Sequence, residues 1–188
     1  PVIEVTLSRR SPETASYAVD SLATMSDPAA AVSLARHAVF SEWDSVRNDA
    51  AKCLKDKPME HYVPVLHGAM EAPVQTRRDL YRTPNGQLNY RYAVFREGRE
   101  RNELTVFDSS YVRVTRNGGD ARESLARAVG DATSRNTTRD MSLFQQNVSA
   151  VQRNARIART LVESTGQNYS ADPTEWWKWW DEHNEVFV

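Results

Sequence analysis

Apolar residues recur at steps of three and four through the first 70 residues of the chain, the spacing of α-helices with one buried face. Ser-Pro at 11–12 and Asp-Pro at 27–28 each join a capping residue to a proline suited to the first helical position. We expect a third helix from near Ser41, with Asp44 in a variant capping box, and a fourth over about 59–70. The predicted inward residues are Ala15, Ala18, Val19, Leu22, Ala31, Leu34, Ala35, Ala38, Val39, Trp43, Val46, Ala50, Cys53, Leu54, Tyr62, Val63, Leu66 and Met70.

The spacing changes to a period of two between positions 74 and 114, which predicts strands. Alternating residues fill 88–95, and Asn-Gly at 85–86 favours a type I′ hairpin turn before them. A second turn is expected at 97–100, followed by a third strand that reaches Tyr111. The pattern predicts a small antiparallel meander in an otherwise helical chain.

Two further helices are predicted after position 117, separated by a polar joint at 134–140. The inward face of the first is Ala121, Leu125, Ala128, Val129 and Ala132. The second has roughly 25 residues, ends at Gly166 and carries a heptad-like stripe with steps of three and four. The stripe consists of Met141, Phe144, Val148, Val151, Ala155, Ala158 and Val162, and three arginines at 153–159 lie off it.

Four tryptophans lie within five positions near the end of the chain, at 176–180. The residues before them, DPTE at 172–175, combine an Asp cap, a Pro at the first helical position and a Glu three residues after the cap. This order predicts a helix start. At 3.6 residues per turn the four rings span an arc of about 160°, so one face of the helix is almost wholly aromatic.

The aromatic face has three interpretations. It can close the hydrophobic end of the helical array, or it can dock a neighbouring domain or partner, because Trp is enriched at interface hot spots. Insertion at a membrane interface is opposed by the acidic residues that follow, Asp181, Glu182 and Glu185. The candidate partner-binding residues of this face are Trp176, Trp177, Trp179 and Trp180.

Residues 46–54 read VRNDAAKCL and resemble the second helix of a HEAT repeat, V-R-x-x-A-x-x-x-L. Residues 61–66, HYVPVL, resemble the first helix of the next repeat, and 18–22 echo 50–54. The resemblance covers about residues 1–72. It implies helical hairpins that stack side by side around one continuous core.

Residues 176–185, WWKWWDEHNE, resemble a W-W-x-W-W…N-E segment of bacterial HEAT-repeat proteins that precedes an intein-like Hint (pretoxin) domain. This resemblance implies a repeat module within a longer, self-processing bacterial protein. No Hint catalytic motif occurs in the chain, so no catalytic role is carried over to any residue. The start at Pro1 instead of Met also leads us to expect a fragment.

Composition adds few constraints. The chain has 188 residues, enough for one sizeable domain or two small ones, and its formal net charge of −1 gives no overall field for nucleic acid or acidic membranes. No apolar run approaches the ~18 residues that span a bilayer. The single cysteine, Cys53, cannot form an internal disulfide and is expected to be a small core residue. The compartment stays open between cytoplasmic and secreted.

The sequence contains no recognisable catalytic constellation. The histidines, His37, His61, His67 and His183, are scattered along the chain. The metal-ligand types at 181–185 point to different sides of a helix. No phosphate-binding glycine loop and no nucleophilic serine motif is present. We therefore predict no metal, no cofactor and no enzymatic activity; an enzyme whose site is discontinuous in sequence is the third alternative.

The meander offers a second candidate surface. Its region carries nine arginines against five acidic residues, with four tyrosines interleaved. Basic residues and stacking rings on a sheet can bind single-stranded nucleic acid. The competing interpretation is that tyrosines pack on a half-exposed sheet and arginines cover its solvent face. The candidate residues are Tyr90, Arg91 and Tyr92.

Together these patterns predict a mainly α fold in three parts: a short HEAT-like helical repeat array (1–72), an antiparallel β-meander insertion (73–116) and a C-terminal part with a long helix and a Trp-rich end helix (117–188). The expected function is a non-enzymatic protein-binding or spacer (scaffold) module of a larger bacterial protein. Its expected partner is a protein or a neighbouring domain of the same chain. Nucleic-acid binding through the meander is the alternative, and a membrane partner is not expected.

Overall fold

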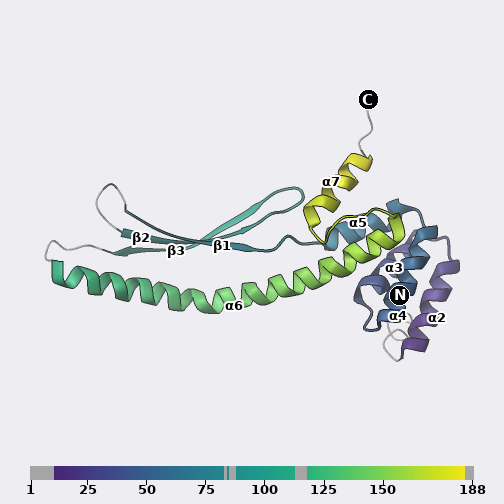
Figure 1. The fold of residues 1–188 in the computed structure, drawn as a ribbon, viewed down its shortest axis with the longest axis horizontal. Helices are drawn as coiled ribbons and strands as arrows, with labels where there is room; N and C mark the ends of the chain where they lie inside the picture. Colours follow the sequence, from purple (N-terminus) through teal and green to yellow (C-terminus); the bar gives the residue numbers. More distant parts are fainter. Residues whose placement is uncertain (1–10, 83, 85–87, 113–117, 185–188) are drawn as a thin grey trace. The chain divides into compact units, whose positions relative to one another are not determined.

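The computed structural model describes residues 11–82, 84, 88–112 and 118–184 of the chain (Figure 1). These residues form six α-helices, one short 3-10 helix and three strands. The predicted class, mainly α with an antiparallel meander and a long C-terminal helix, is confirmed. The hairpin turn predicted at Asn85-Gly86 lies outside the described residues.

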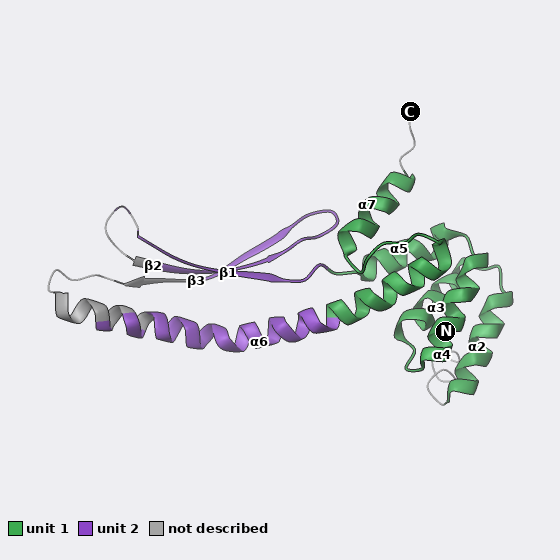
Figure 2. Ribbon diagram, viewed as in Figure 1, with its two compact units in different colours: residues 1–71, 150–188 green, residues 72–149 purple. Residues whose placement is uncertain are grey.

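The chain divides into two compact units (Figure 2). Unit 1 comprises residues 1–71 and 150–188, and unit 2 comprises residues 72–149. The expected boundary near 72 lies at the junction of the two units, whereas position 117 lies inside unit 2. Helix α6 (Gly118–Thr165) contributes its first part to unit 2 and its last part to unit 1.

Unit 1 is helical. It contains α2 (Pro12–Thr24), α3 (Pro28–Phe40), α4 (Asp44–Cys53), the 3-10 helix η1 (Leu54–Asp56), α5 (Met59–Ala69), the last part of α6 and α7 (Pro173–Asn184). The predicted inward residues of its first four helices are buried except Ala18, Trp43 and Cys53, which are half-buried. The apolar spacing therefore predicted most of the core residues in these helices.

The first two helix starts match the predicted caps. Ser11 Oγ accepts a hydrogen bond from the backbone N–H of Thr14 at 3.2 Å. Asp27 Oδ1 accepts one from the backbone N–H of Ala29 at 2.7 Å. Each cap thus satisfies an amide donor that has no partner within its own helix.

The predicted start of the third helix near Ser41 is wrong, because α4 begins at Asp44. Ser41 instead follows the last turn of α3, where its backbone N–H donates to the carbonyl of His37 at 3.2 Å. Trp43 takes the N-cap position of α4 and makes no side-chain capping bond. A residue that closes one helix does not begin the next one here.

Unit 2 contains a three-stranded antiparallel sheet in the order β1-β2-β3. The strands are β1 (Gln75–Arg82), β2 (Leu88–Arg96) and β3 (Glu103–Val112). Tyr92 on the central strand lies opposite Arg78 on β1 and Phe107 on β3. Figure 1 shows the first part of α6 running along the sheet.

The core of unit 2 forms between β2 and α6. Tyr90, Tyr92 and Ala132 are buried together, with Val94 and Phe107 packed against them. Residues 90, 92 and 94 share one face of the strand, as the period of two predicts. One helix face therefore covers one sheet face.

The polar joint predicted at 134–140 is wrong, because α6 continues through it without a break. This segment has no Pro or Gly to end the helix. Two of its polar residues make contacts inside unit 2: Asn136 is fully buried, and Asp140 accepts a hydrogen bond from Tyr92. Helix α6 ends where predicted, before Gly166, whose φ of 75° is the left-handed conformation that favours glycine.

Candidate partner-binding site

Helix α7 begins as its sequence predicts. Asp172 Oδ1 accepts hydrogen bonds from the backbone N–H of Thr174 at 3.0 Å and from its hydroxyl at 2.9 Å. Glu175 does not reach back to Asp172. Its Oε2 accepts hydrogen bonds from the backbone N–H and the hydroxyl of Ser170, at 3.0 and 2.6 Å. These bonds fix the chain that leads into the tryptophan helix.

Most of the aromatic face of α7 is buried in unit 1. Trp176, Trp177 and Trp180 are buried and Trp179 is half-buried. The indole N–H of Trp176 donates to the carbonyl of Ser170 at 2.8 Å, and that of Trp177 to the carbonyl of His67 on α5 at 3.4 Å. This burial supports the interpretation that α7 covers the hydrophobic core. Docking through these rings stays a prediction.

The tyrosines proposed in the meander are buried as well. Tyr90 and Tyr92 lie on the sheet face that packs against α6. Arg91 points to the other face, is exposed, and lies with its guanidinium 5.0 Å from the ring centre of Tyr81. Two of the stacking rings are therefore covered. The nucleic-acid interpretation stays a prediction that depends on Tyr81 and the exposed arginines.

Among the described side chains of α6, the large apolar ones that are exposed come from the predicted heptad spacing. Met141 is 63% exposed, Phe144 is 68% exposed and Val148 is 40% exposed. We call these three residues the α6 stripe; all belong to unit 2. Val151, the next position of the same spacing, is exposed too.

The α6 stripe differs from the face that α6 buries. The buried or half-buried residues Ala132, Asn136 and Asn147 lie about 120° around the helix from the stripe. The sequence predicted the apolar spacing of the stripe. It did not predict that a second, largely polar line of residues makes the contacts inside the protein.

Other candidate chemistry is sparse in the described part of the chain. No group of three or more His, Cys, Asp or Glu side chains there is placed to hold a metal ion. Burial raises the pKa of the half-buried Cys53 thiol, and the carboxylates of Asp20 and Asp49 add to this effect. Among the described helices, none is both long and apolar enough to cross a membrane.

No family model, curated protein or solved structure matches this chain. The resemblances to HEAT repeats over 1–72 and to the segment before Hint domains at 176–185 therefore stay predictions. They rest on the residues quoted above.

Proposed function

We propose that this protein is a non-enzymatic protein-binding module whose partner is a second copy of the same chain, paired through the α6 stripe. The observation that carries the proposal is the exposure of Met141 and Phe144, two large apolar side chains one helical turn apart. Large apolar side chains gathered on one surface are typical of interaction sites in soluble proteins.

The spacing of the stripe suits a helix as the partner. The steps from Met141 to Phe144 and from Phe144 to Val148 are three and four residues, the alternation that places side chains in the gaps of a facing helix. A second α6 offers the same alternation. The stripe is therefore complementary to itself, as a two-fold symmetric contact requires.

Charge favours the same partner. The nine residues 141–149 carry no charged side chain, although 26% of the whole chain is charged. Two copies of this surface meet without repulsion between like charges. Three side chains from each copy form a small contact, so we expect a weak, concentration-dependent dimer rather than a permanent one.

The test is sedimentation equilibrium of the full chain from micromolar to near-millimolar concentration. We expect the wild-type protein to dimerise across this range. Phe144→Glu should remain monomeric, because the contact then contains a carboxylate without a partner. Gln146→Glu adds the same charge at an exposed position on the opposite side of α6 and should dimerise like the wild type.

Circular dichroism of both variants checks that the helices are retained. Wild-type protein that stays monomeric over the whole range would contradict the proposal. So would a Phe144→Glu variant that dimerises as well as Gln146→Glu.

A further inference from the structure

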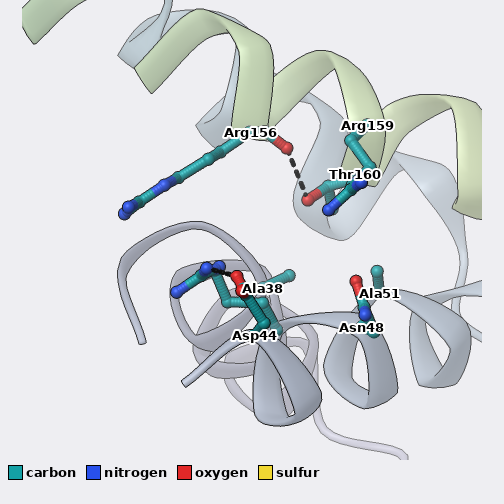
Figure 3. A pocket seen from close by; sticks show the side chains of 8 residues that line it. Ala38, Asp44, Asn48, Ala51, Arg156, Arg159 and Thr160 are labelled. Carbon is teal, nitrogen blue, oxygen red and sulfur yellow. Dashed lines mark hydrogen bonds and ion pairs between the residues drawn. The ribbon is translucent and has the colours of Figure 1, made fainter. Parts of the chain in front are cut away.

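Unit 1 contains a small basic hollow between α4 and the last part of α6 (Figure 3). Its volume is about 230 Å³. Arg156 and Arg159 extend from α6 opposite Asp44 and Asn48 of α4. Arg47 and Thr160 also line it. We call this site the basic hollow.

Positive charge exceeds negative charge in the basic hollow. Three guanidinium groups, from Arg47, Arg156 and Arg159, face one carboxylate, that of Asp44. The next carboxylate along α6, Glu163, lines a neighbouring hollow and is paired with Lys55 at 2.8 Å. The basic hollow therefore has a surplus of two positive charges.

The three arginines differ in how their donors are used. Arg47 pairs with Asp44 and donates to the carbonyl of Ser41. Arg156 makes one long hydrogen bond, 3.4 Å, to the carbonyl of Val39. Arg159 has no hydrogen-bond or ion-pair partner among the described residues, so its donors are available to a ligand.

The gathering of like charges in the basic hollow is unfavourable. The pKa of Arg47 lies below its ordinary value, mainly because its side chain is half-buried and further because of the charges on Arg156 and Arg159. An anion in the basic hollow relieves this repulsion and supplies acceptors for the unused N–H groups.

We propose that the basic hollow binds a phosphate group. A phosphate group carries about −1.5 to −2 charges at pH 7, which matches the surplus of two positive charges. Its several oxygens accept the paired N–H donors of guanidinium groups. The hollow is smaller than the roughly 300–1,000 Å³ of pockets for drug-sized molecules, so it holds a small group rather than a large ligand.

A simple carboxylate suits the basic hollow less well than a phosphate group. It carries one negative charge, so it leaves half of the surplus positive charge uncompensated. The phosphate itself has two possible sources, the free ion or a phosphorylated small molecule. Inorganic phosphate and O-phosphoserine separate these two sources, and acetate tests the preference for phosphate over carboxylate.

The test is calorimetric titration of the full chain with each of the three probes at constant ionic strength, because salt screens exposed charges. We expect phosphate or phosphoserine to bind and acetate to bind at least about tenfold more weakly. Arg159→Gln should weaken phosphate binding about tenfold by removing donors in the basic hollow. Arg36→Gln, on the exposed surface of α3 in the same unit, removes the same charge outside the hollow and should bind like the wild type.

Tighter binding of phosphoserine than of phosphate assigns the group to a phosphorylated molecule, and the reverse assigns it to the free ion. The proposal is overturned if neither probe binds or if acetate binds as tightly. It is also overturned if Arg36→Gln weakens binding as much as Arg159→Gln, since the effect is then general attraction. Thermal unfolding of both variants without ligand identifies any loss of folding, and Arg159→Lys then repeats the test with the charge retained.

Discussion

At the scale of single residues, Tyr92 shows how tertiary contacts change a side chain. Its hydroxyl donates to Asp140 Oδ1 at 2.6 Å, and Asp140 also pairs with Arg78. Burial, followed by the hydrogen bond to the Asp140 carboxylate and its charge, raises the pKa of Tyr92 to about 12. The alternation of strand residues predicted its face. It did not predict the carboxylate from α6, 48 positions further along the chain.

The raised pKa of Tyr92 predicts a pH dependence of stability. In the unfolded chain the hydroxyl titrates near its ordinary value of about 10. The stabilisation is therefore complete below about pH 10 and is lost as the pH rises toward about 12. Tyr92→Phe should lack this dependence. We expect the difference in the free energy of unfolding between the wild type and Tyr92→Phe, measured by urea unfolding, to shrink by roughly 2–3 kcal/mol as the pH rises through this range. Parallel pH profiles of the two proteins would contradict this prediction.

At the scale of elements, α6 is joined to the chain before β1 by two asparagines. The side-chain amide of Asn147 both donates to the carbonyl of Val74 and accepts from its N–H, each at 2.8 Å. Asn154 makes the same pair of bonds to Glu71, at 2.7 and 3.2 Å. Each amide side chain pairs with one backbone N–H and one backbone carbonyl. A neighbouring strand satisfies such backbone groups in the same way. The apolar spacing of the helix did not indicate a role for either asparagine.

Asn154→Ala should destabilise unit 1. The change removes two hydrogen bonds to the backbone of Glu71 from a buried side chain, at a cost of roughly 2 kcal/mol. Gln152→Ala removes an exposed amide from the same helix and should change stability by less than about 0.5 kcal/mol. The measurement is urea unfolding followed by tryptophan emission. Equal stability of the two variants would show that this contact contributes little.

At the scale of the whole molecule, two separate cores divide the structure. All five tryptophans belong to unit 1, at position 43 and at four positions of α7. The core of unit 2 is built on Tyr90, Tyr92 and Ala132. Tryptophan emission therefore reports on unit 1, whereas circular dichroism reports on both units.

Substitutions in the two cores should affect these signals differently. Leu34→Ala, at a fully buried position of unit 1, should lower the free energy of unfolding by about 3 kcal/mol. The unfolding midpoint followed by tryptophan emission should therefore fall. Tyr92→Leu should lower the midpoint of part of the circular dichroism change and leave the emission midpoint unchanged, because Tyr92 belongs to the core of unit 2 and the tryptophans belong to unit 1. If both signals shift together in Tyr92→Leu, the two units unfold as one cooperative structure.

Periodic spacing and local turn chemistry determined the elements of this protein. The caps at Ser11 and Asp27 and the end of α6 at Gly166 involve residues close together in sequence, so the sequence alone predicts them. The start of α4 was misplaced because Ser41 follows the last turn of α3, whereas α4 begins at Asp44. A local pattern shows which residue types can begin a helix, but not which neighbouring helix uses them.

The sequence by itself determined the mainly α class, the antiparallel meander and the positions of most core residues in unit 1, because these follow from spacing along one element. The tertiary structure decided which face of α6 is buried. It placed Asp140 against Tyr92 and made α6 continuous, left the α6 stripe exposed, and brought Arg47 to the same hollow as Arg156 and Arg159. These features depend on pairs of residues far apart in the chain, and neither partner carries a local signal of the other.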